Sequence, residues 1–120
     1  MSKPIDWQGV ARQWAEFRGW KIEGVWWTHP EKGMVRLDCE PEFDRSVDDL
    51  LVSLPAGWYA DINADWLADG TPSWMASIRT QKVCPLGHAH SHDTAAHALL
   101  MACVKAMEEE RDRLHRSKRA

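Results

Sequence analysis

The chain has 120 residues, of which 44% are hydrophobic and 28% charged, and its formal net charge at pH 7 is −3. These values fit a single globular domain over residues 1–120 with a core of its own, and they do not favour a disordered chain. Because no run of about twenty apolar residues occurs and the start lacks an apolar stretch, we expect a cytoplasmic protein without membrane contact.

The first third of the chain predicts one helix and two strands. Residues 7–18 are expected to form an amphipathic helix that begins at an Asp6 N-cap. Its apolar residues recur at helical spacing: Trp7, Val10, Trp14 and Phe17. Residues 20–27 and 34–40 are expected to be strands, separated by a turn that contains Pro and Gly.

The remainder predicts a helix, a hairpin and a final helix. Ser46 is a candidate N-cap for a short helix over residues 47–54. Residues 57–66 and 73–80 are expected to pair as an antiparallel hairpin. The first of these strands alternates, with its buried face formed by Trp58, Ala60, Ile62, Ala64 and Trp66. The last helix is expected over residues 94–114.

The stretch "CPLGHAHSHD", residues 84–93, precedes this helix and is predicted to be a polar loop with Asp93 as N-cap. The resulting order is αββαββα. It predicts the α+β class, with an αβα-type sandwich in which helices pack on an antiparallel sheet of about four strands.

Four segments of the chain resemble the small phage ABA-sandwich domain family of bacteriophages and prophages. They are "PEFDRSVDDLLVSLP", "GWYADI", "SWMASIRT" and "HDTAAHALLMACVKAM". The family positions correspond to Phe43, Trp58, Trp74, Asp93, Thr94 and Ala95. The resemblance covers about residues 34–110 and leaves out the Trp-rich residues 1–33 and the histidine-rich stretch. It implies a phage or prophage origin, hence the cytoplasm of a bacterial host, and αβα layering, but it supplies no catalytic residues.

The histidine-rich stretch also contains candidate metal ligands. Cys84, His88, His90 and His92 have side chains of the types that bind Zn²⁺ tetrahedrally. All four lie within nine residues, whereas structural zinc sites usually take ligands from two separated segments, so a polar loop is the alternative interpretation. A third interpretation pairs a Cys84 thiolate with a His88 base. No motif of a known catalytic class is present, so we expect no enzyme and no cofactor other than zinc.

Charge and tryptophan point to a protein partner. Residues 38–69 contain nine acidic residues and one basic residue, a net charge of −8, which favours a basic partner surface over direct nucleic-acid binding. A merely solubilising acidic face is the alternative. Most of the eight tryptophans are expected in the core, but adjacent strand residues face opposite ways, so Trp26 and Trp27 cannot both be buried. The candidate partner-binding residues are Trp26, Trp27, Asp38, Glu40, Asp61 and Asp65.

Together these features predict a non-enzymatic phage-type protein that binds another protein of host or phage. A sharper hypothesis is an inhibitor whose acidic surface occupies a basic, nucleic-acid-binding site on a host defence complex. The alternatives are a zinc-stabilised regulatory domain and a structural homodimer that associates through the Trp26–Trp27 region.

Overall fold

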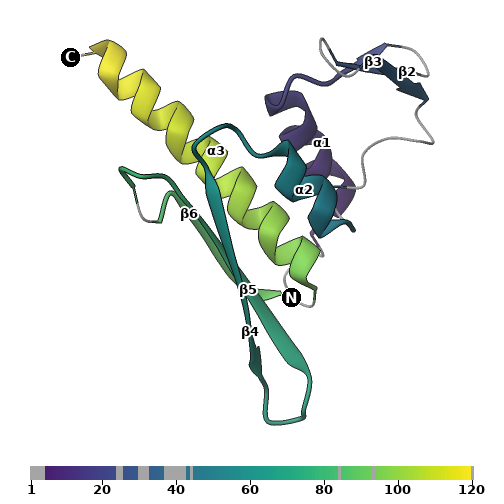
Figure 1. Ribbon diagram of the computed structural model, residues 1–120, viewed down its shortest axis with the longest axis vertical. Helices are drawn as coiled ribbons and strands as arrows, with labels where there is room; N and C mark the ends of the chain where they lie inside the picture. The colour runs from purple at the N-terminus through teal and green to yellow at the C-terminus, as the bar shows by residue number, and fades with distance from the viewer. Residues whose placement is uncertain are drawn as a thin grey trace.

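The computed structural model describes residues 5–23, 26–29, 33–36, 43, 45–83, 85–92 and 94–119. The class is α+β, as predicted from the sequence. Within the described residues, the elements follow the order α1 β1 β2 β3 α2 β4 β5 β6 α3 (Figure 1). This order differs from the expected αββαββα because a strand was predicted where the chain forms two, and a loop where it forms a strand.

The helices begin close to the predicted residues. They are α1 (Trp7–Phe17), α2 (Val47–Ser53) and α3 (Ala95–Arg119). As predicted, the Asp6 carboxylate accepts the Gly9 N–H at 3.1 Å, and the Ser46 hydroxyl caps α2. At the start of α3 the Thr94 hydroxyl accepts the His97 N–H at 3.1 Å, whereas Asp93, the predicted cap, lies outside the described residues.

The strands form two separate antiparallel sheets of three rather than one sheet of about four. The first contains β1 (Lys21–Glu23), β2 (Trp26–His29) and β3 (Gly33–Arg36). The second contains β4 (Tyr59–Trp66), β5 (Pro72–Arg79) and β6 (Gly87–His92). The single strand predicted over residues 20–27 is divided between β1 and β2, which pair with each other through Glu23 and Trp26. The predicted strand 34–40 extends into residues outside the description.

Helix α3 separates the second sheet from the other helices. It packs on β5 and β6 with one side and on α1 and α2 with the other (Figure 1). The opposite face of the sheet carries the exposed side chains of Tyr59, Asp61, Asn63 and Asp65. The described layers are therefore sheet, helix, helix, and not the expected αβα layering.

Small residues allow α3 to lie close to the sheet. A Cβ atom at Gly87 of β6 would overlap the backbone of Ala102 and Ala106 in α3. Further alanines fill the same interface and are almost completely buried: Ala76, Ala89 and Ala98. Close packing of this kind leaves no space for a larger side chain.

Helices α1 and α2 are joined by a buried polar contact. The Trp14 indole N–H donates to the Ser53 hydroxyl at 2.8 Å, and that hydroxyl donates to the Leu50 carbonyl at 2.7 Å. The Arg18 side chain donates to the Ser53 carbonyl at 2.5 Å. These hydrogen bonds pair the buried polar groups of the contact. The contact therefore fixes the orientation of α1 relative to α2 and leaves none of its donors unsatisfied.

The first prediction concerns the Gly87 contact. We expect Gly87→Ala to lower the free energy of unfolding by about 1–3 kcal/mol, because the added methyl group must displace α3. Urea denaturation followed by circular dichroism measures this change. Asn63→Ala, at an exposed strand position, serves as the control and should stay within about 0.5 kcal/mol. A Gly87→Ala midpoint equal to that of the unmodified protein would contradict the close contact.

Candidate functional site

The β4–β5 hairpin extends beyond the helices at its far end (Figure 1). Its strands pair continuously from Tyr59 with Arg79 to Trp66 with Pro72. At the tip, the Leu67 N–H donates to the Thr71 carbonyl at 2.8 Å and the Gly70 N–H to the Leu67 carbonyl at 2.9 Å. Gly70 has φ +87°, which suits the left-handed position of a three-residue hairpin loop. The tip is therefore a defined turn.

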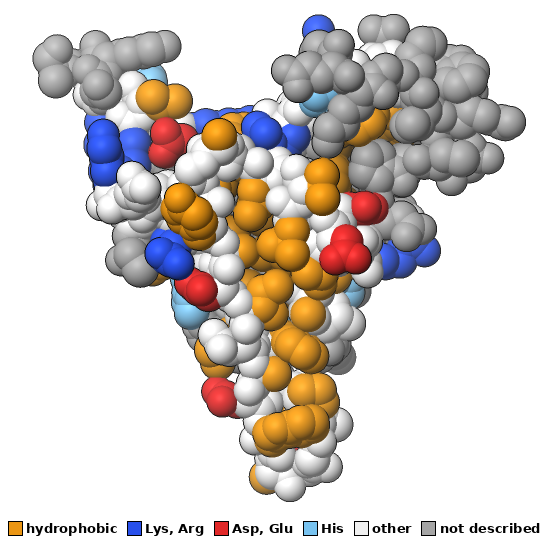
Figure 2. All heavy atoms as spheres, in the orientation of Figure 1, with side chains coloured by type: hydrophobic (Ala, Val, Ile, Leu, Met, Phe, Trp, Pro, Cys, Tyr) orange, Lys and Arg blue, Asp and Glu red, His pale blue; other side chains and the backbone are white. Residues whose placement is uncertain are grey.

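Two large apolar side chains are exposed at this tip. Trp66 is 75% exposed and Leu67 52% exposed. The prediction that Trp66 belongs to the buried face of its strand is therefore wrong. The alternation itself is correct, since Ala60, Ile62 and Ala64 are half-buried, but α3 covers β5 and β6 and reaches β4 much less. Figure 2 shows hydrophobic side chains down the middle of the viewed side of the molecule and at its narrow lower end, where the hairpin tip lies in Figure 1.

Acidic side chains accompany the exposed apolar ones. Asp61 and Asp65 lie on the open face of β4, as predicted. Asp61 forms an ion pair with Arg79 at 3.1 Å, so its charge is partly offset. In the turn, the Thr71 hydroxyl and N–H donate to the Asp69 carboxylate at 2.6 and 3.0 Å, which holds the pKa of Asp69 below its ordinary value. Asp69 is therefore ionised at neutral pH.

Of the other predicted partner-binding residues, Trp27 is the one whose side chain is described. Trp27 is only 3% exposed and packs against Trp20 with ring centroids 6.4 Å apart, so it offers no surface to a partner. Trp27 is therefore the buried member of the two adjacent tryptophans. The side chain of Trp26 and all of Asp38 and Glu40 lie outside the described residues.

Gly87–His92 of the histidine-rich stretch form strand β6 and not the predicted loop. Ala89 fits completely beneath α3, and this buried position, together with pairing to β5, outweighs the low strand preference of the surrounding residues. The register places His88 opposite Ser77 and His92 opposite Trp74, with an irregularity between them. Because paired residues share a face, His88 and His92 lie on opposite faces.

This arrangement separates two of the four candidate zinc ligands. The rings of His92 and Trp7 meet edge to face with their centroids 5.5 Å apart, and Trp7 also stacks on His97 with a centroid distance of 3.9 Å. Cys84 and the side chain of His90 lie outside the described residues. Within the described part of the chain, no three His, Cys, Asp or Glu side chains gather as a metal site would require. Zinc binding through Cys84 and His90 stays a prediction, as does the pairing of a Cys84 thiolate with His88.

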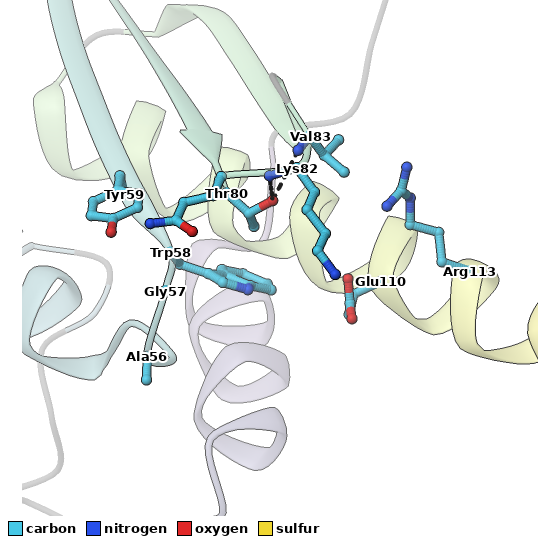
Figure 3. Close-up of a pocket in the computed structure, with 10 residues that line it drawn as sticks. Ala56, Gly57, Trp58, Tyr59, Thr80, Lys82, Val83, Glu110 and Arg113 are labelled. Carbon is cyan, nitrogen blue, oxygen red and sulfur yellow. Dashed lines mark hydrogen bonds between the residues drawn. The ribbon is translucent and has the colours of Figure 1, made fainter.

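A pocket of about 400 Å³ lies at the base of the hairpin, next to α3 (Figure 3). The Trp58 indole forms one wall, and the side chains of Lys82 and Glu110 point toward each other beside it. Arg113, at the rim, pairs with Glu109 at 3.6 Å. Because the lining combines both signs of charge, it favours no single class of ligand.

Comparison with known proteins gives no match: no protein-family model, curated protein or solved structure matches this chain. The resemblance to the phage ABA-sandwich family thus stays a prediction. Among the described helices, none is long and apolar enough to cross a membrane.

The exposed tip was missed by reasoning from the sequence, although a signal for it exists. Trp66 and Leu67 directly precede "ADGT", a turn sequence with Gly at the left-handed position. A side chain at the end of a hairpin has fewer neighbours than one in the middle. The alternation pattern describes only which face a residue shares, and not whether another element covers that face.

Helix α3 contains a thiol that the fold protects. Cys103 is completely buried, and burial raises the pKa of its thiol well above the ordinary value. We expect slow alkylation of Cys103 by iodoacetamide in the native protein and fast alkylation in urea. Mass spectrometry of the separate cysteine peptides distinguishes Cys103 from Cys39 and Cys84.

The raised pKa also has a consequence for stability. The thiol of the unfolded chain ionises near pH 9.0, whereas the buried thiol of the folded protein stays protonated. The stability that the buried Cys103 thiol contributes is therefore lost as pH rises above 9.0.

Equal alkylation rates for Cys103 in native and denatured protein would contradict its burial and show that the thiol is accessible.

Proposed function

We propose that this protein acts by binding another protein through the tip of the β4–β5 hairpin. The tip surface consists of Asp65, Trp66, Leu67 and Asp69. The exposure of Trp66 is the observation that supports this proposal most directly. Tryptophan is among the residues most enriched at the energetic centres of protein interfaces, where its large ring loses contact with water.

The geometry of the hairpin supports the same proposal. Continuous pairing with β5 and the hydrogen-bonded turn hold the tip in one conformation before a partner arrives. A surface that is ordered in advance loses less conformational entropy on binding than a flexible loop. The Trp66 ring would fill a pocket of the partner, whereas Leu67, which follows it in the chain and points to the opposite face, would contact the partner on the side of Asp65.

The charge of the tip favours a basic partner. Asp65 directly precedes Trp66 in the chain, and Asp69 lies in the turn that follows Leu67. Asp65 has no ion-pair partner among the described residues. These carboxylates would repel phosphate and attract lysine and arginine side chains. The sharper hypothesis is a phage inhibitor that occupies the nucleic-acid-binding site of a bacterial defence complex. It rests on this charge together with the family resemblance.

The test is a quantitative comparison of variants. Trp66→Ala combined with Leu67→Ala removes the apolar side chains of the tip, and we expect at least about tenfold weaker capture of a specific partner from bacterial lysate. Because both side chains are largely exposed, the melting temperature should change little. Quantitative mass spectrometry of the retained proteins, over a titration of lysate, measures the effect.

The control removes exposed apolar side chains elsewhere. Val52→Ala with Leu114→Ala alters residues that are 75% and 57% exposed on α2 and α3, close to the values for the tip. The control should retain the partner, and retention should fall as salt concentration rises. If the tip variant and the control retain the same proteins equally, the tip is not the binding surface.

A further inference from the structure

Strand β4 forms an edge of its sheet. The strand order is β4-β5-β6, and among the described residues β4 pairs only with β5. Hydrogen-bonded and non-hydrogen-bonded residue pairs alternate along an antiparallel ladder. Leu67 and Thr71 continue the register of β4 with β5, and the Leu67 N–H donates to the Thr71 carbonyl, so this is a hydrogen-bonded pair. Every second residue back along β4 therefore also forms a hydrogen-bonded pair, and the odd-numbered residues direct their backbone groups toward β5. The bond from the Leu86 N–H to the Ile78 carbonyl of β5 fits this alternation.

The even-numbered residues of β4 therefore present backbone N–H and C=O groups at the free edge. They are Ala60, Ile62, Ala64 and Trp66. The register of β4 with β5 contains no bulge over its entire length. By contrast, the other edge strand, β6, is irregular between its pairings with Trp74 and Ala76. A regular edge can accept another strand, whereas a bulge interrupts such pairing.

Side chains along β4 define what an added strand must carry. On one face, Ile62, Ala64 and Trp66 form an apolar row that α3 leaves partly uncovered. On the other face, Asp61 and Asp65 are exposed. Opposite charges on directly neighbouring strands stabilise their pairing. The complementary strand has apolar residues on the first face and basic residues on the second.

We propose that the partner contributes an extended segment of alternating basic and apolar residues, which adds to the sheet as a strand beside β4. This inference rests on the proposed function, to which it adds the mode of binding and the chemistry of the partner. Backbone hydrogen bonds along the edge provide affinity, and the alternating side chains provide specificity. The exposed Trp66 lies at the end of the same row, where it covers the last apolar residue of the added strand.

The same charges disfavour a second copy of this chain in the register that would pair the middle of β4 with itself. In the antiparallel register centred on Asn63, Asp61 of one chain lies opposite Asp65 of the other, and the reverse pair follows by symmetry. Like charges directly opposite each other destabilise a strand pair. A basic segment removes this repulsion and forms ion pairs in its place.

The test uses the full chain and a synthetic peptide of alternating valine and lysine with blocked ends. Amide hydrogen exchange is followed by NMR with and without the peptide. We expect the Ile62 and Ala64 amides, which face the free edge, to exchange at least about tenfold more slowly when the peptide is bound. The Asp61 and Asn63 amides already bond to β5 and should change far less. A valine and glutamate peptide is the matched control and should leave every rate unchanged.

Two variants examine backbone and charge separately. Ala64→Pro removes an N–H that the sheet itself does not use, so the protein should fold and lose the peptide-induced slowing at Ile62. Asp65→Lys should weaken peptide binding at least about threefold and leave the melting temperature near that of the unmodified protein. Asn63→Ala is the control on the same strand and should bind the peptide normally.

Several outcomes would overturn the strand-addition model. The first is an equal effect of the lysine and glutamate peptides, and the second is peptide binding without slower exchange at Ile62 and Ala64. The third is slowing of amide exchange that grows with protein concentration in the absence of peptide, which would identify a second copy as the occupant. If the tip variant Trp66→Ala, Leu67→Ala loses its partner while the lysine peptide has no effect, the proposed function stands and strand addition fails. If the peptide slows the edge amides while the tip variant keeps its partner, the tip proposal fails instead.

Discussion

The close contact between α3 and β6 is the constraint on which the other parts of the structure depend. Gly87 meets the backbone of Ala102 and Ala106, and Ala89 is completely buried in the same interface. A helix this near a strand must follow the sheet closely, so small residues on both elements fix the position of the helix. Because α1 and α2 pack on the opposite side of α3, their positions follow from the same contact.

The placement of α3 also determines what stays uncovered. A helix that packs mainly on β5 and β6 covers β4 only partly, although β4 keeps the apolar alternation of a buried strand. The exposed Trp66 continues the core pattern of Ala60, Ile62 and Ala64 beyond the end of the core. The proposed interaction surface thus arises from a mismatch between the length of the hairpin and the area that the helix covers.

The sequence predicted correctly those features that depend on interactions between residues close together in the chain. The Asp6 and Ser46 caps and the β4–β5 hairpin depend on neighbouring residues, and the structure confirms them. Strand β6 could not be predicted in this way, because it depends on long-range pairing with β5 and on space beneath α3. The exposure of Trp66 was missed for the same reason, since the extent of the helix cover is a tertiary property.

The exposed edge of β4 raises a physical question that any account of function has to answer. Edge strands in natural proteins are protected by proline, lysine, bulges or covering elements, because an open edge pairs with other chains. The described β4 residues contain neither proline nor lysine and pair without a bulge, so Asp61 and Asp65 are the charged residues along this edge. Carboxylates repel a second acidic edge of the same kind but attract a basic one. The carboxylates that disfavour pairing of two copies in the register centred on Asn63 would therefore also select the proposed basic partner.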